Sequence, residues 1–177
     1  MLDAQHDFNF QTGDREIGFK WFLKTYKERL YWLIRRIVVI HEDADDVLQN
    51  TFIKVWQNLS DYRGDANIYT WAYRIAVNES LAFLKKKKRQ TFGHIDYSEV
   101  LSQYLESDVY FDGSDFQKKL QKAILKLPEQ QRIVFNLRYF DDMKYQDMAK
   151  ILDRSEGGLK ANYHHAVKKI EGFIKDD

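Results

Sequence analysis

The stretch DADDVLQNTFIKVWQN (residues 43–58) decides how the first half of this 177-residue chain folds. Its apolar residues recur at intervals that place one wide apolar stripe along a helix with 3.6 residues per turn. Asp43 is expected to cap the first turn, and Asp45 and Asp46 suit the positive end of the helix dipole. The opposite face is polar, and its spacing alone is typical of a solvated helix surface. The stripe consists of Val47, Leu48, Thr51, Phe52, Val55, Trp56 and Leu59.

A turn and a second helix follow. The residues DYRGD (61–65) form a turn by composition, and Gly64 is free to adopt a positive φ. The helix after the turn has one apolar row, and Tyr69 and Tyr73 lie on a different face. One core face cannot use all of these rings, so some are expected near the surface. The row consists of Ile68, Trp71, Ala72, Ile75 and Ala76.

This second helix ends in the basic run KKKKR (Lys85–Arg89). Adjacent cations repel one another, and a polyanionic ligand would relieve that repulsion. A frayed, solvated helix end is the alternative interpretation. Because aromatic rings stack on bases and cations track phosphates, aromatic residues that lead into a basic run favour a nucleic-acid strand as the ligand.

The composition indicates an all-α protein, with one proline, eight glycines and 44% apolar residues. The net charge of +1 provides no global attraction to nucleic acid, so any such binding must come from local patches. The absence of cysteine excludes disulfides and thiolate zinc sites and fits a reducing cytoplasm. No apolar run approaches the roughly 20 residues of a membrane helix. We therefore expect a cytoplasmic protein without membrane insertion.

The pattern divides the chain into two small helical domains. Residues 1–14 are expected to form a flexible N-terminal arm, residues 15–91 the first domain and residues 115–177 the second. The linker, residues 92–114, is rich in carboxylates and contains no Lys or Arg. It is too apolar for a purely solvated tether, so we expect it to pack locally.

The second domain ends in a helix-turn-helix pattern. The pair Asp141-Asp142 ends one helix and is expected to cap the next, and Ser155 is expected to cap the last. Small residues such as Gly158 would allow close approach to a DNA groove. A helical hairpin with a solvated face is the alternative. The outward side of the last helix offers side chains that can reach bases or phosphates: Lys160, Ala161, Asn162, His164, His165, Lys168 and Lys169.

No pattern for enzyme chemistry is present. The sequence has no cysteine nucleophile, no glycine-rich phosphate loop and no His-Glu-x-x-His motif. His164 and His165 are adjacent, so they point about 100° apart on a helix and make a poor metal pair. We expect no catalytic residue, no metal site and no cofactor.

Three motifs together resemble the extracytoplasmic-function (ECF) group of bacterial RNA polymerase sigma factors, group 4 of the sigma-70 family. The resemblance covers roughly Glu16 to Ile174. It implies a region 2 helical bundle followed by the acidic linker and a region 4 helix-turn-helix. The motifs are DADDVLQNTFIKVWQN, YRGDANIYTWAYRIAVNESLAFLKKKKR and LPEQQRIVFNLRYFDDMKYQDMAKILDRSEGGLKANYHHAVKKI.

The resemblance also implies a role for each patch. The polar face of the 43–58 helix would dock the clamp helices of the polymerase largest subunit through Asp43, Asp45, Asp46, Gln49 and Asn50. The turn and the helix after it would hold the opened −10 promoter strand through Tyr62, Arg63, Gly64, Asn67, Trp71, Tyr73, Arg74, Asn78, Lys85, Lys86, Lys87, Lys88 and Arg89. The last helix would enter the major groove of the −35 element with Ser155, Gly158, Lys160, Ala161, Asn162, His164, His165 and Lys168.

The implied partners are core RNA polymerase, promoter DNA and an anti-sigma factor, the last at the clamp-binding face. The last helix departs from the family pattern, since Asn162, His165 and Val167 stand where the family often has arginine. Weak upstream DNA binding by the isolated domain is therefore expected.

The alternative function is a stand-alone helix-turn-helix regulator with an N-terminal dimerisation or sensor domain. An all-helical scaffold that binds no nucleic acid is a third interpretation.

Overall fold

The computed structural model describes residues 14–64, 67–90, 104 and 114–175. Within these ranges the regular structure consists of α-helices and one short 3-10 helix, which confirms the all-α prediction. The expected N-terminal arm and the expected linker lie outside the described residues, apart from Asp14, Tyr104 and Ser114.

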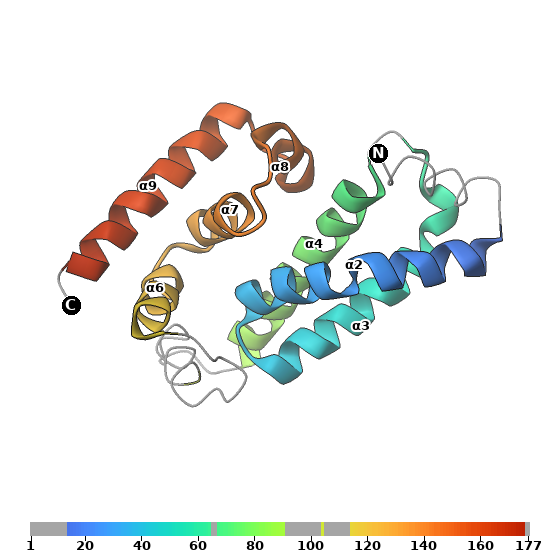
Figure 1. The fold of residues 1–177 in the computed structure, drawn as a ribbon, viewed down its shortest axis with the longest axis horizontal. Coiled ribbons are helices and arrows are strands. Elements are labelled where there is room, and N and C mark those ends of the chain that lie inside the picture. Colours follow the sequence, from blue (N-terminus) through green and yellow to red (C-terminus); the bar gives the residue numbers. More distant parts are fainter. Residues whose placement is uncertain (1–13, 65–66, 91–103, 105–113, 176–177) are drawn as a thin grey trace.

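Three helices form the N-terminal unit: α2 (Arg15–Val38), α3 (His41–Gln57) and α4 (Ile68–Gln90). Each packs against the other two, and the 3-10 helix η1 (Leu59–Asp61) follows α3. Figure 1 shows α2 and α3 side by side with α4 against them. The buried residues of α3 are Ala44, Val47, Leu48, Thr51 and Val55, so the apolar stripe predicted for this helix faces the core.

The start of α3 corrects one sequence prediction. The residue before the helix is Ile40, in an extended conformation, and Asp43 lies within the first turn instead of capping it. The reason is local: Val39 takes a positive φ of 71° and ends α2, so the next helix can begin at once with His41. Asp43 remains at the positive end of the helix dipole.

Four helices form the C-terminal unit: α6 (Asp115–Leu125), α7 (Glu129–Tyr139), α8 (Tyr145–Leu152) and α9 (Glu156–Lys175). Ser114 and Gln117 make a reciprocal capping box at the start of α6. The turn between α8 and α9 places Asp153 in the left-handed region, with φ 52°, which an aspartate tolerates. Ser155 caps α9 as predicted, because its Oγ accepts a hydrogen bond from the Gly158 N–H at 3.2 Å.

The predicted capping by Asp141 and Asp142 is wrong. The residue before α8 is Lys144, which makes no side-chain cap, because α8 begins only at Tyr145. Asp142 instead pairs with Arg138 of α7 at 2.8 Å. Asp141 pairs with Arg36 of α2 at 2.8 Å, so it joins the two units.

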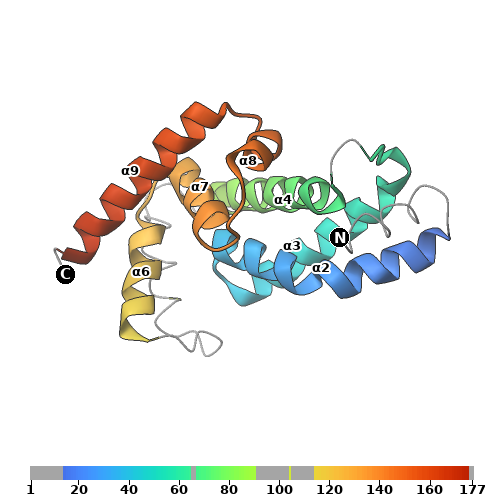
Figure 2. The same ribbon diagram turned by 45° about the horizontal axis from the view of Figure 1, so that its top comes forward.

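The two units pack directly on each other. In Figure 2, α4 lies between the α2–α3 pair and α8, while α7 contacts the end of α2. Apolar residues of α7 and α8 belong to the same buried cluster as the core of the N-terminal unit. A second cluster, formed by Ala123, Ile124, Leu127, Phe135, Ala166 and Ile170, holds α6, α7 and α9 together. Helix α9 therefore lies outermost, with one side open to solvent.

Candidate nucleic-acid and protein interfaces

The polar residues predicted for one face of α3 lie together on its exposed side, except for Asp43. Asp46, Gln49 and Asn50 are exposed, and the half-exposed Asp45 lies 3.5 Å from the Nε2 atom of His41. Asp43 turns away from this face: its carboxylate forms an ion pair with Lys87 of α4, and its side chain is only 14% exposed. Asp43 therefore connects α3 to the basic run of α4.

An apolar groove beside this polar face was missed by the sequence reasoning. It has a volume of about 440 Å³ and lies between the start of α2 and the end of α3. Ile53, on the polar side of α3, is 53% exposed there. The feature of the sequence that could have indicated this groove is Ile53, the one apolar residue on the otherwise polar face of α3. The lining residues are Glu16, Phe19, Lys20, Phe52, Ile53, Trp56 and Gln57.

The turn before α4 presents some of its predicted residues and buries others. Gly64 has φ 76°, which confirms its left-handed conformation. Arg63 and Asn67 are exposed, and the Asn67 carboxamide accepts a hydrogen bond from the Tyr69 N–H at 2.8 Å. Tyr62 is only 7% exposed, because its ring packs 5.3 Å from the ring of the half-buried Trp71. In this structure Tyr62 supports the turn from inside.

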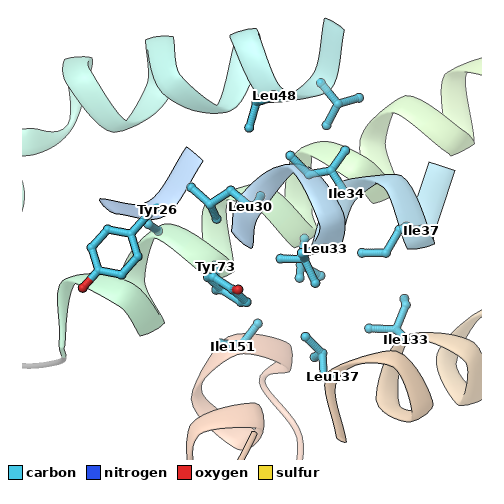
Figure 3. Packing of buried hydrophobic residues seen from close by; sticks show 14 of the residues in the cluster. Tyr26, Leu30, Leu33, Ile34, Ile37, Leu48, Tyr73, Ile133, Leu137 and Ile151 are labelled. Atoms are coloured by element: carbon cyan, nitrogen blue, oxygen red, sulfur yellow. The ribbon is translucent and has the colours of Figure 1, made fainter. Parts of the chain in front are cut away.

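Tyr73 is not at the surface. It is fully buried, and Figure 3 shows its ring among Leu33 of α2, Leu137 of α7 and Ile151 of α8. Its ring lies 4.1 Å from that of Tyr69, over which the Arg29 guanidinium sits at 4.2 Å. Burial raises the pKa of the Tyr73 phenol well above its ordinary value. The sequence reasoning placed Tyr73 on a second face of α4 correctly, but did not anticipate that α7 and α8 cover that face.

The other predicted side chains of α4 are accessible. Arg74 and Asn78 are exposed, and α4 remains helical through the basic run to Gln90. Lys88 forms an ion pair with Glu129 of α7 at 2.9 Å. Beside this pair lies an open groove of about 450 Å³, lined by Leu81, Ala82, Lys85, Lys88, Arg89 and Glu129. The basic run therefore combines exposed cations with two that are paired to carboxylates.

Helix α9 gathers the residues predicted for the −35 element on its solvent side. Gly158, Lys160, Ala161, His164, His165 and Lys168 are exposed, and Ser155 is exposed in the turn before them. Asn162 is half-buried, and its Nδ2 donates to the Gly158 carbonyl at 3.0 Å. Lys160 lies 3.8 Å from the Glu156 carboxylate and 5.6 Å from the Tyr145 ring centroid. One continuous polar surface results, facing away from the buried side of the helix.

Two absences hold for the described part of the chain. No group of three or more histidine, aspartate or glutamate side chains in it could hold a metal ion. No helix in it is long and apolar enough to cross a membrane.

Family models match both units. The model described as Sigma-70 region 2 matches residues 22–90, and the model described as Sigma-70, region 4 matches residues 117–170. The region 2 match covers all of α3 and α4 and the part of α2 from Phe22 onward, and the region 4 match includes α7 and α8.

Full-length relatives agree with these matches. The chain is 32% identical over 148 residues to the RNA polymerase sigma factor YlaC of Bacillus subtilis, which covers 82% of this chain and 85% of that protein. It is 26% identical to the ECF RNA polymerase sigma factor SigW of Bacillus subtilis, over 94% of this chain and 93% of that protein.

Solved structures show the same fold. The sigma factor RpoE of Bartonella quintana, in complex with the anti-sigma factor NepR, superimposes with a TM-score of 0.70 at 20% identity, over 90% of this chain and 98% of that one. CnrH, in complex with the cytosolic domain of CnrY, gives a TM-score of 0.74 at 18% identity, over 100% of this chain and 99% of that one. The chain therefore belongs to the ECF group of the sigma-70 family of RNA polymerase sigma factors, and it is a promoter-recognising factor for transcription initiation.

Proposed function

We propose that the two helical units divide promoter recognition between them. The domain of residues 15–91 docks on core RNA polymerase and holds the opened −10 strand, and the domain of residues 115–177 binds the −35 duplex, with residues 92–114 as the linker. The observation that carries this proposal is the segregation of exposed polar residues: one set lies on α3 and another on the solvent side of α9. Because a helix can enter a major groove, the α9 surface suits duplex DNA.

Polymerase docking is assigned to Asp45, Asp46, Gln49 and Asn50 on α3. The apolar groove around Ile53 lies beside these residues and would supply buried contact area within the same interface. Asp43 has a different role, because its ion pair holds Lys87 and so orients the basic run.

The −10 strand is assigned to the exposed cations and amides at the turn and along α4. Arg63, Asn67, Arg74 and Asn78 lead from the turn toward the basic run, which would contact phosphates. Tyr62 and Trp71 stack on each other and would form the wall of a pocket for a flipped base. Tyr73 could take part only after α7 and α8 leave α4.

The −35 element is assigned to α9. Lys160 and Lys168 are exposed and suit phosphates or guanine, while Asn162 already uses its Nδ2 group on the helix backbone. Few cations point outward, so the C-terminal domain alone should bind weakly, and specificity would come from both domains acting on one DNA molecule.

The chain is also proposed to work without catalysis, in the cytoplasm, under the control of an anti-sigma factor. The structural neighbours RpoE and CnrH are each in complex with another protein, NepR or the cytosolic domain of CnrY, which supports the last point. The test of the whole proposal is transcription from duplex promoter DNA by purified core polymerase. RNA synthesis that requires this chain supports it, whereas tight operator binding without polymerase would favour a stand-alone regulator.

A further inference from the structure

The exposed side of α9 carries two adjacent histidines. His164 and His165 both face solvent, and their ring centroids lie 6.0 Å apart. Figure 1 shows α9 along the outer edge of the C-terminal unit, and the helices that pack on it are α6, α7 and α8. Within the described residues, neither ring takes part in an ion pair or a hydrogen bond. Both imidazoles are therefore accessible to a proton and to a ligand.

The charges along α9 leave this surface short of fixed cations. Lys160 and Lys168 lie one helical turn before and one after His164, and both are exposed. Lys160 lies 3.8 Å from the Glu156 carboxylate, which offsets its charge. The first half of α9, from Glu156 to His165, contains this one carboxylate and this one ammonium group. Its net charge is therefore zero as long as the two histidines are neutral.

The helices packed on the other side of α9 place their titratable groups away from the two rings. The groups of α7 and α8 surround the half-buried Tyr163, the residue before His164; they are Arg138, Tyr139 and Tyr145. On α6, the Lys126 ammonium lies 5.3 Å from the centroid of the Phe173 ring, further along α9. Among the described residues of the free chain, protonated histidines on α9 would therefore have no anionic partner.

The position of the histidines along α9 favours contact with DNA phosphates. The first residues of a recognition helix contact base edges in the major groove. His164 lies eight positions after Glu156, which is a rise of about 12 Å along the helix axis. The major groove is about 12 Å wide, so side chains at this distance reach its rim, where the sugar–phosphate backbone lies. Each ring would meet negative charge there.

We propose that His164 and His165 contact the backbone of the −35 element as imidazolium cations, so that binding of this duplex takes up protons. A neutral imidazole has one N–H donor, whereas the protonated ring has two donors and a positive charge. Two cations this close repel each other in the free chain, and neighbouring phosphates relieve that repulsion and favour the charged forms. The proposal rests on the assignment of α9 to the −35 element and adds a dependence on pH to it.

The direction and size of the effect follow from proton uptake and counterion release. Because histidine gains its charge as the pH falls from 8 to 5, the −35 contact should be stronger at pH 6 than at pH 8. Each phosphate that is neutralised adds about 0.9 to the slope of log affinity against log salt, so two imidazolium contacts should steepen the slope by up to about 1.8. At a salt concentration of about 0.1 M, the affinity should be at least about tenfold higher at pH 6.

The test uses the full chain assembled with core polymerase on promoter DNA that has a duplex −35 element and a premelted −10 region. The affinity is measured by fluorescence anisotropy over a range of salt concentrations at pH 6 and pH 8. H164Q/H165Q removes both titratable rings, so its salt slope should be the same at the two pH values. H164K/H165K carries fixed cations, so it should bind at pH 8 about as tightly as the parent chain binds at pH 6.

Two controls separate this contact from other effects of pH. Lys168→Gln removes a cation from the same side of α9 without removing a group that titrates in this range, so it should lower the salt slope equally at pH 6 and pH 8. On DNA that lacks the −35 duplex, the parent chain and both double variants should show the same pH dependence. Circular dichroism of each variant checks that the helices are intact.

Two results would overturn the inference: a parent salt slope that is equal at pH 6 and pH 8, or a pH-dependent slope that persists in H164Q/H165Q. Failure of the −35 assignment gives a different result, because removal of the −35 duplex would then leave the affinity of the parent chain unchanged at both pH values. That outcome would overturn the assignment of α9 together with the inference drawn from it.

Discussion

Tyr73 offers a direct test of the packing of α7 and α8 on α4. Its ring is fully buried, and its hydroxyl donates to the Arg29 carbonyl in a long contact of 3.5 Å. Tyr73→Phe should therefore cost less than about 1 kcal/mol at neutral pH. Because burial raises the pKa of the Tyr73 phenol in the folded chain, the native state keeps that proton where the unfolded chain loses it.

The sign and size of the pH effect follow from this difference. The raised pKa leaves stability unaffected below pH 10, the ordinary tyrosine pKa, and reduces it as the pH rises above that value. The wild-type chain should lose about 1.4 kcal/mol per pH unit above pH 10 relative to Tyr73→Phe. Urea unfolding of both chains at pH 8 and pH 11 measures this difference.

Absorbance at 295 nm provides an independent readout. The chain has 11 tyrosines, and removal of Tyr73 should leave the titration of the folded protein unchanged. Tyr139→Phe is the control, since that ring is 54% exposed and its loss should reduce the absorbance change by the share of one tyrosine. If Tyr73→Phe reduced the change as much as the control does, the ring would be accessible in solution and the reasoning would be refuted.

Three further predictions concern the docking face, the basic run and the second core. Asp46→Arg should weaken the binding of core polymerase at least about tenfold without loss of stability. Glu28→Ala removes an exposed acid on α2 and should leave polymerase binding unchanged, so equal effects of the two variants would contradict the assignment of the docking face to α3. Alanine at each exposed cation of the basic run (Lys85–Arg89) should lower the salt dependence of promoter binding, read from the slope of log affinity against log salt. Ile124→Ala should lower the free energy of unfolding, measured with denaturant, by about 2–5 kcal/mol, because Ile124 is only 1% exposed in the cluster of α6, α7 and α9. A loss below about 1 kcal/mol would contradict that packing.

Several predictions from sequence were confirmed because they depend on neighbours along the chain. The apolar spacing of α3, the left-handed Gly64 and the cap at Ser155 all involve residues within about one or two helical turns. Such contacts are present in any fold that contains the helix or the turn. Periodicity and turn chemistry therefore determined the elements and, together with the family motifs, the kind of protein.

Other features depend on partners that are far away in the chain. Asp141 pairs with a residue 105 positions earlier, and Lys87 pairs with a residue 44 positions earlier. A carboxylate that the local pattern places at a helix end can cap that helix or reach another one, and the local pattern does not decide between these outcomes.

The amino-acid sequence by itself determined which segments are helices and which helix faces are apolar, polar or basic. Only the tertiary structure decided that α7 and α8 cover the second aromatic face of α4, which buries Tyr73 and leaves Asp141 inside the interface. The physical reason is that the apolar face of a helix favours removal from water but does not determine which other helix covers it. The choice of partner depends on the complementary shape and charge of a surface that is formed only when the whole chain has folded.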